Sequence, residues 1–188
     1  MFFRLQHYFR FILRSTNQHG VHSPFIYQLV TRCFYDKTTH ASYGAIASLF
    51  RKRKPAKLTI KTARLLNRLP RFLRCKTVLI IEDSPIISTI VTIENTLTVT
   101  SEINSDVHYD MICVHRQSAT PQLLDQLISK THNDTVLLIT NIHQSSQSID
   151  QWQQLKTHAK TRVTIETFNL GFVFFRKEQA KEDFIIRK

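Results

Sequence analysis

The sequence predicts an α/β fold: a mostly parallel sheet of reduced size, a C-terminal antiparallel hairpin and several N-terminal helices. Three short apolar runs are typical of buried parallel strands, and they comprise residues 78–81, 109–115 and 135–140. A helical pattern at residues 121–130 separates the second run from the third, which indicates a right-handed βαβ unit. Near the end, Asn169-Leu170-Gly171 separates two strand-like segments, residues 162–168 and 172–176, and predicts the hairpin.

The first helix is expected at residues 2–14. Its apolar residues recur at roughly helical spacing with three arginines between them, and they are Phe2, Leu5, Phe9, Ile12 and Leu13. We expect this apolar stripe to pack on its own domain. The alternative is a basic amphipathic helix that lies on an anionic membrane.

Three more helices should precede the sheet. Ser23 and Pro24 form a typical helix start and predict a helix at residues 24–35. A short helix is expected at residues 41–53. A longer one is expected at residues 59–74, which Pro70 should end or kink because proline has no backbone N–H.

The region after the first strand carries conflicting signals. Ser84-Pro85 announces a helix, but residues 86–93 are nearly all β-branched, so this stretch stays open between helix and strand. A strand is expected at residues 96–100. The link to the next strand is shorter than a parallel crossover usually requires, so either this strand is not a parallel neighbour or the sheet has lost elements.

Further along the chain, three smaller elements are expected. Asn133-Asp134 predicts a turn before the third apolar run. Residues 148–160 predict a helix, and residues 184–186 predict a short last strand.

With 188 residues, of which 42% are hydrophobic, the chain is long enough for one compact domain. Within it we distinguish a basic helical part, residues 1–76, from a sheet-containing core, residues 77–188. The cysteines Cys33, Cys75 and Cys113 suit neither a metal site nor a disulfide framework, which favours a reducing cytoplasm. No uncharged run approaches the ~20 residues of a membrane span, so we expect a soluble protein without a transmembrane segment.

The net charge of +12 comes from one segment. Residues 37–81 carry twelve basic residues and no acidic one, whereas residues 82–188 carry ten basic and thirteen acidic residues. The basic segment could neutralise several phosphates of a nucleic acid. Its aromatic residues are Tyr43, Phe50 and Phe72, which is thin for a base-stacking surface, so a solvated basic face is the simpler interpretation.

Sequence motifs of several enzyme classes are missing. The chain contains no G-x-x-x-x-G-K, no G-x-S-x-G and no H-E-x-x-H. His19 and His22 have no further ligand at a site-like spacing, so we expect no metal site there and interpret both as hydrogen-bonding or capping residues.

Four segments of the chain resemble one family. They read HGVHSPFIYQLV, KTARLLNRLPRFLRCKTVLIIEDSPIIST, HNDTVLLITNIHQS and VTIETFNLGFVFFRKEQAKEDFIIR. Together they resemble bacterial class I S-adenosylmethionine-dependent methyltransferases related to small-molecule O-methyltransferases, in a shortened and divergent form. The resemblance implies a Rossmann-like sheet that ends in the hairpin, and S-adenosylmethionine as the cofactor if any is bound.

The departures from the family pattern fall where the cofactor should bind. The family's first strand ends in a pattern like L-E-x-G-x-x-x-G, and the matching positions here are Ile80, Glu82 and Ile86. Glycine lets the backbone approach a ligand closely, whereas a side chain fills that space. The resemblance places cofactor positions at Glu82, Ser84, Glu102 and His115. Glu102 could hold ribose hydroxyls, although a solvated loop glutamate is the simpler interpretation.

One candidate for catalysis remains. The family's acidic residue after the fourth strand corresponds to His115, and its Asp-Asp-Ile-His-Trp motif corresponds to Thr140-Asn141-Ile142-His143-Gln144, so both acidic positions are replaced. His143 is retained and is a candidate general base. A structural, hydrogen-bonding role for His143 is the commoner alternative.

Three functions stay open at this point. The first is a methyltransferase-like protein with a degenerate cofactor site and little or no catalysis, a pseudoenzyme that acts through an unknown small molecule or protein partner. The second is an active small-molecule methyltransferase with an atypical cofactor loop. The third is a nucleic-acid-binding module that uses residues 37–81.

Overall fold

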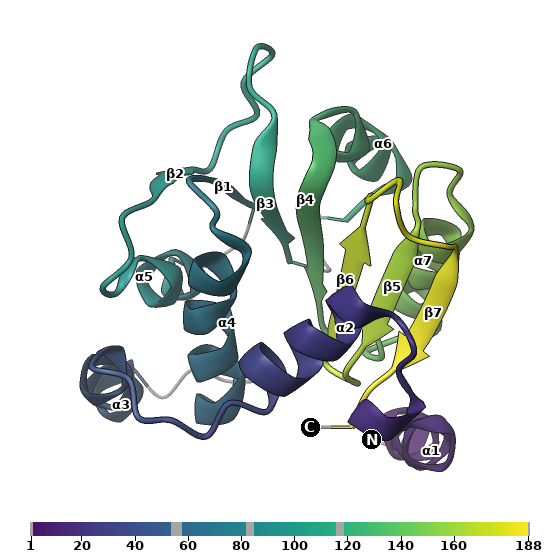
Figure 1. Ribbon diagram of the computed structural model, residues 1–188, viewed down its shortest axis with the longest axis horizontal. Coiled ribbons are helices and arrows are strands. Elements are labelled where there is room, and N and C mark those ends of the chain that lie inside the picture. Colours follow the sequence, from purple (N-terminus) through teal and green to yellow (C-terminus); the bar gives the residue numbers. More distant parts are fainter. Residues whose placement is uncertain (1, 54–57, 82–84, 116–118, 188) are drawn as a thin grey trace.

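The computed structural model describes residues 2–53, 58–81, 85–115 and 119–187, in which helices cover a seven-stranded sheet (Figure 1). The strand order is β2-β1-β3-β4-β6-β5-β7. The strands are β1 (Thr77–Ile81), β2 (Thr98–Thr100), β3 (Tyr109–Val114), β4 (Thr131–Thr140), β5 (Val163–Glu166), β6 (Leu170–Phe174) and β7 (Glu182–Ile185). β1 to β4 run parallel, and β6 runs antiparallel to both β4 and β5. The predicted α/β fold with a C-terminal hairpin is confirmed.

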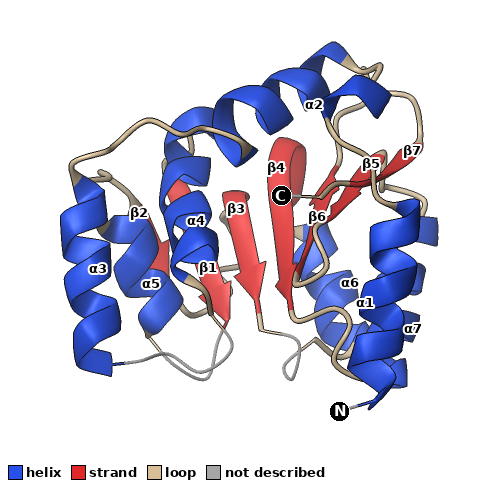
Figure 2. Cartoon of the chain, turned by 90° about the horizontal axis from the view of Figure 1, so that it is seen from below, coloured by secondary structure: helices blue, strands red, loops and turns tan. Residues whose placement is uncertain are grey.

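The helices lie on both faces of the sheet (Figure 2). They are α1 (Phe2–Arg14), α2 (Pro24–Leu29), α3 (Ser42–Arg53), α4 (Ile60–Leu73), α5 (Ile86–Thr92), α6 (Pro121–Ser129) and α7 (Ser146–Thr157). A short 3-10 helix, η1 (Gln18–Gly20), follows α1, and the π-helix η2 (Val30–Phe34) continues α2. None of these described helices combines the length and the apolar character needed to cross a bilayer.

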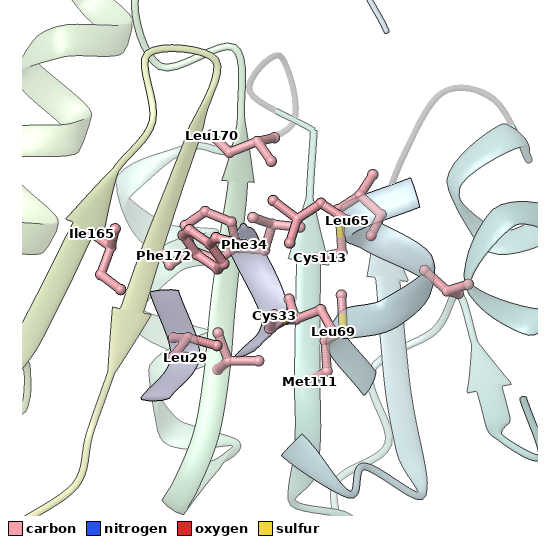
Figure 3. Packing of buried hydrophobic residues seen from close by; sticks show 14 of the residues in the cluster. Leu29, Cys33, Phe34, Leu65, Leu69, Met111, Cys113, Ile165, Leu170 and Phe172 are labelled. Carbon is pink, nitrogen blue, oxygen red and sulfur yellow. The ribbon is translucent and has the colours of Figure 1, made fainter. Parts of the chain in front are cut away.

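The strands bury apolar side chains on both faces, because successive residues of a strand point to opposite sides. In β1, Val78 and Ile80 join the cluster formed with α2, η2, α3, α4 and α5, whereas Leu79 joins the cluster formed with α6 and α7. Figure 3 shows the larger cluster, in which Phe34 of η2 meets Phe172 of β6. Helices α2 to α5 therefore share one hydrophobic cluster with one face of the sheet, and α6 and α7 share a second cluster with the other face.

The undecided stretch at residues 86–93 forms a helix, α5. Its β-branched residues are tolerated because Ile87, Ile90 and Val91 fall on one face and are buried against the core. Asn67 of α4 donates its side-chain amide to the carbonyl oxygens of Ile90 and Ile93, which satisfies the helix end. Tertiary packing thus outweighs the weak helix propensity of the stretch.

One local prediction was wrong, and one of the two alternatives for Pro70 is excluded. Asn133 and Asp134 lie inside β4 rather than in a turn, because a register shift between Tyr109 and Met111 of the neighbouring β3 accommodates them. Pro70 does not end its helix, since α4 continues to Leu73.

The strand predicted at residues 96–100 pairs in parallel with β1. The alternative that it is not a parallel neighbour is therefore excluded. β2 pairs over three residues, which run from Thr98 to Thr100. Because β2 is so short, the chain has little distance to return before β3 begins, and residues 101–108 suffice without a helix.

Helix α1 is turned differently from the prediction. Phe11 is buried, and with Tyr8 it packs against the ring of Phe168, whereas Leu13 is 86% exposed and Phe9 is 60% exposed. The inward face of α1 is formed by Arg4, His7, Tyr8 and Phe11. These four side chains contact Phe168 and His143 at the end of the sheet. Leu5, Phe9 and Leu13 of the predicted apolar stripe therefore lie largely in solvent, which corrects the expectation that the stripe packs on the domain.

Candidate functional site

The carboxyl end of β4 carries His143, the candidate base. Asn141 directly after the strand has a left-handed backbone with φ 58°, and its N–H donates to the carbonyl of Asn169 at 2.6 Å. Ile142 is buried beside it. These contacts hold the turn against the β5–β6 connection, so the imidazole of His143 faces the carboxyl end of β5.

His143 meets a buried glutamate there. His143 Nε2 lies 2.7 Å from Glu166 Oε1, and the indole N–H of Trp152 donates to Glu166 Oε2 at 3.1 Å. Since a carboxylate can only accept, the proton of the imidazole sits on Nε2. The side chains of His143 and Glu166 are only 11% and 9% exposed, so the pair is largely shielded from water.

The charge of Glu166 is stabilised by these donors. Burial would raise the pKa of Glu166, but the hydrogen bond and charge of His143, the Trp152 hydrogen bond and the charge of Lys156 together lower it below the usual value. Glu166 therefore stays ionised near neutral pH.

Aromatic rings close the site from the side of α1. The ring of Phe168 stacks on His143 with centroids 5.1 Å apart, and the ring of His7 lies 5.7 Å from His143. Arg4 lies over Phe168 and donates to the Asn169 side chain at 2.6 Å. Burial, and next the charge of His143, lower the pKa of His7. Helix α1 thus acts as a cover over the end of the hairpin.

One polar atom in this cluster has no partner. Nδ1 of His143 is buried and makes no hydrogen bond to the described residues. A carboxylate-oriented imidazole with a free second nitrogen is the arrangement of a general base. In this structure, however, that nitrogen is buried and not exposed to solvent.

Of the four residues assigned to a cofactor by resemblance, Glu102 and His115 lie after β2 and β3. Glu82 and Ser84 fall outside the described residues. Glu102 follows β2 and is exposed, and its backbone N–H donates to the Thr100 hydroxyl at 3.2 Å. His115 follows β3, where its N–H donates to the carbonyl of Ile81 at 2.8 Å. These placements leave the cofactor roles of all four residues as predictions.

The residues around β1 do not fit S-adenosylmethionine in the usual way. Ile86 begins α5 and packs its branched side chain against the hydrophobic core. The sequence holds three glycines, and none lies in the segment directly after β1. Gly20 lies against Thr16, Gly44 is in α3, and Gly171 lies against Trp152. A glycine cradle that would let the backbone approach the ligand is therefore missing.

A metal site is not formed either within the described parts of the chain. No three His, Cys, Asp or Glu residues there are grouped as ligands. The buried thiol of Cys33 has its pKa raised to about 12 by burial, which disfavours the thiolate that would bind a metal.

Several residues of this site were not identified from the sequence. Glu166 lies in β5, Trp152 in α7, His7 in α1 and Phe168 in the β5–β6 connection, and these residues meet only in the fold. One signal was available: Glu166 is the single charged residue in a strand whose other members are apolar or hydroxylated, and such a residue needs a partner.

Solved structures with a similar fold are known. A methyltransferase from Geobacter sulfurreducens matches with a TM-score of 0.53 and 10% identity over 74% of this chain and 91% of the other. An SAH-bound methyltransferase from Podospora anserina matches with a TM-score of 0.51 and 10% identity over 84% and 98%. For a cofactor-bound protein from MTB, the TM-score is 0.51 and the identity 9%, over 79% and 97%.

These likenesses establish the fold. The chain has the Rossmann-like methyltransferase fold, in a divergent form, and the fold class implied by the resemblance is confirmed. No family model and no curated protein sequence matches the chain.

Proposed function

We propose that this chain is a methyltransferase-like protein whose cofactor site is degenerate and which carries out little or no catalysis, a pseudoenzyme acting as an interaction or regulatory module. The observation that carries the proposal is the replacement of the glycine cradle after β1. Glu82 and Ile86 stand where the family has hydrogen atoms for side chains, and Ile86 is committed to the core. An acidic side chain at position 82 would also repel the carboxylate of S-adenosylmethionine.

The His143 region supports the same proposal. The imidazole is shielded by Phe168 and His7, and its Nε2 is bound to Glu166. A base that must accept a proton from a substrate needs access to that substrate. The cluster therefore serves first to fix α1 and the hairpin to the end of β4.

A calorimetric titration of the full chain with S-adenosylmethionine tests this proposal. We expect no heat of binding up to millimolar cofactor, and no methyl transfer from labelled cofactor to a panel of phenolic and catecholic acceptors. A cofactor-binding methyltransferase of the same fold, titrated in parallel, shows that the assay detects binding. Micromolar affinity for the wild-type chain would refute the proposal.

The His143–Glu166 pair favours a second candidate function, an active small-molecule methyltransferase that uses S-adenosylmethionine. Here Glu166 would orient the imidazole, and Nδ1 of His143 would remove the proton of a substrate hydroxyl after α1 moves aside. This candidate predicts that His143→Ala abolishes turnover while S-adenosylmethionine affinity stays unchanged. Equal turnover in wild type and variant would remove His143 from the mechanism.

A further inference from the structure

A cavity of about 570 Å³ opens in the N-terminal helical part, and none of its lining residues belongs to the His143 cluster. Its walls come from η1, the end of η2 with the loop that follows, the start of α3, and α4. No residue of the sheet contributes to it. Six residues define its character: Phe34, Lys37, Tyr43, Lys61, Arg64 and Arg68.

Arg68 lines the cavity, and its guanidinium is held by hydrogen bonds within the protein. Its guanidinium donates to the Cys33 carbonyl through Nε at 3.1 Å and Nη2 at 2.7 Å, and to the Tyr43 hydroxyl through Nη1. These bonds fix Tyr43 and the end of η2 to α4. The cavity is therefore a preformed feature of the helical packing.

The one carboxylate that lines the cavity, Asp36, is occupied. It accepts from His40 Nε2 at 2.7 Å and from the backbone N–H and hydroxyl of Thr38 at 2.8 and 2.7 Å. Although burial opposes this, those bonds lower its pKa to about 2. Asp36 has little capacity left to neutralise the other cations of the cavity.

Three basic side chains of the cavity form no ion pair with any described residue. The guanidinium of Arg64 lies over the Tyr43 ring at 4.6 Å, and its Nε is buried with no hydrogen-bond partner in the described chain. Lys37 and Lys61 are exposed and form no ion pair with any described residue. Like charges around one hollow repel one another, and a bound anion would relieve that repulsion.

We propose that this cavity binds a small organic phosphate. Arg64, Lys37 and Lys61 would provide the charge-assisted hydrogen bonds that phosphate oxygens accept, and Phe34 and Leu65 would contact the organic part of the ligand. The volume lies in the range of ~300–1,000 Å³ that is typical of small-molecule sites. This inference concerns a different part of the fold and holds whether or not S-adenosylmethionine binds.

A nucleic acid is the competing occupant, because the same residues belong to the basic segment 37–81. The observations favour a small ligand: the cations line a hollow, and the aromatic ring of Tyr43 is already covered by Arg64 rather than free to stack on a base. An RNA phosphate backbone would instead require a basic track along the surface.

The test titrates the full chain with pyrophosphate and with ADP in a calorimeter at low salt. The variant Lys61→Ala/Arg64→Gln should bind at least about tenfold more weakly than wild type, as expected for the loss of charge-assisted contacts. The matched control is Lys160→Ala/Arg162→Gln, which removes the same charges from exposed positions before β5 and should change affinity less than about twofold. If the first variant does not fold, Lys37→Ala/Lys61→Ala changes two exposed side chains and should show the same loss.

Several results would overturn the inference. These are no binding of either probe by wild type at millimolar concentration, or an equal loss of affinity in the control variant. A third is an RNA oligonucleotide that binds far more tightly than ADP, with steep salt dependence, and that pyrophosphate does not displace. That last result would identify a nucleic-acid surface instead.

Discussion

Two groups of charged residues in this molecule are built in opposite ways. At the carboxyl end of β4 and β5, every oxygen of the buried Glu166 carboxylate has a donor, and rings of His7 and Phe168 close over His143. In the helical cavity, Arg64 and Lys61 face a hollow without carboxylate partners among the described residues. Charges that satisfy one another stabilise a fold, whereas charges left unsatisfied around a cavity indicate a ligand.

The largest loss of stability should follow from breaking the buried group around Glu166. Glu166→Ala leaves the Trp152 indole N–H and His143 Nε2 buried without an acceptor, which should cost about 3 kcal/mol of unfolding free energy. Urea denaturation followed by Trp152 fluorescence measures this loss. Glu178→Ala, which removes an exposed carboxylate bonded to Asn133, is the control and should barely move the midpoint. Similar midpoints for both variants would show that the Glu166 group is not a structural lock.

Two glycines differ in the space around them: Gly171 is closely packed, whereas Gly44 is on an open surface. A Cβ on Gly171 would lie 2.5 Å from Trp152 Cζ3, so Gly171→Ala should destabilise by about 1–3 kcal/mol through displacement of the indole. A Cβ on Gly44 in α3 would meet nothing within 4 Å, so Gly44→Ala should stabilise by about 0.5 kcal/mol through helix propensity. Thermal melts of the two variants should shift in opposite directions. A shift in the same direction would contradict this account of the Trp152 corner.

Lowering the pH should reduce the stability of the folded chain through two carboxylates, Glu166 at the end of β5 and Asp36 in the helical cavity. The pKa of Glu166 is lower in the folded chain than its ordinary value of 4.5, so the unfolded chain takes up the proton first. The contribution of Glu166 is full above that value and is lost as the pH falls through the folded pKa. Asp36 behaves likewise between its ordinary value of 3.8 and about 2.

Urea unfolding at pH 7, 5, 4 and 3 would measure these contributions. The stability gap between wild type and Glu166→Gln should narrow as the pH falls, and the gap to Asp36→Asn should narrow at lower pH still. Gaps that stay constant across this range would show that neither carboxylate is more acidic in the folded state.

The smallest effect on stability is expected for the basic residues of the helical cavity. Lys61 is exposed and has no ion-pair partner in the described chain, so Lys61→Gln should change the unfolding free energy by less than about 0.5 kcal/mol. A denaturation curve that coincides with wild type, together with weaker pyrophosphate binding, would separate ligand binding from folding at this position. A large loss of stability would instead make Lys61 a structural residue.

Much of the sheet could be predicted because its signals are local. The apolar runs of β1, β3 and β4 are bounded by polar residues, and the hairpin of β5 and β6 was confirmed together with its antiparallel pairing. Residues 86–93 could not be decided, because the contacts of Asn67 that favour α5 come from another helix. The turn prediction at Asn133-Asp134 was wrong for a similar reason, since a bulge against β3 depends on the partner strand.

The candidate sites were less predictable than the fold. His143 was identified by resemblance, but its partner Glu166 lies 23 residues away and its cover, His7, lies in the first helix. The excess of positive charge was evident from the sequence, whereas the gathering of Lys37, Lys61, Arg64 and Arg68 around one cavity depends on how α4 packs beside η2 and α3. A periodic pattern identifies the buried face of an element, but not which elements meet at a site.

The central claim is that the fold has been kept while the room for a methyl donor has been filled. Crystals grown with millimolar S-adenosylmethionine would test it most directly, at the carboxyl ends of β1 and β2. We expect electron density for the side chains of Glu82 and Ile86 and none for the donor beside them. Density for S-adenosylmethionine lodged against these two residues would contradict the account.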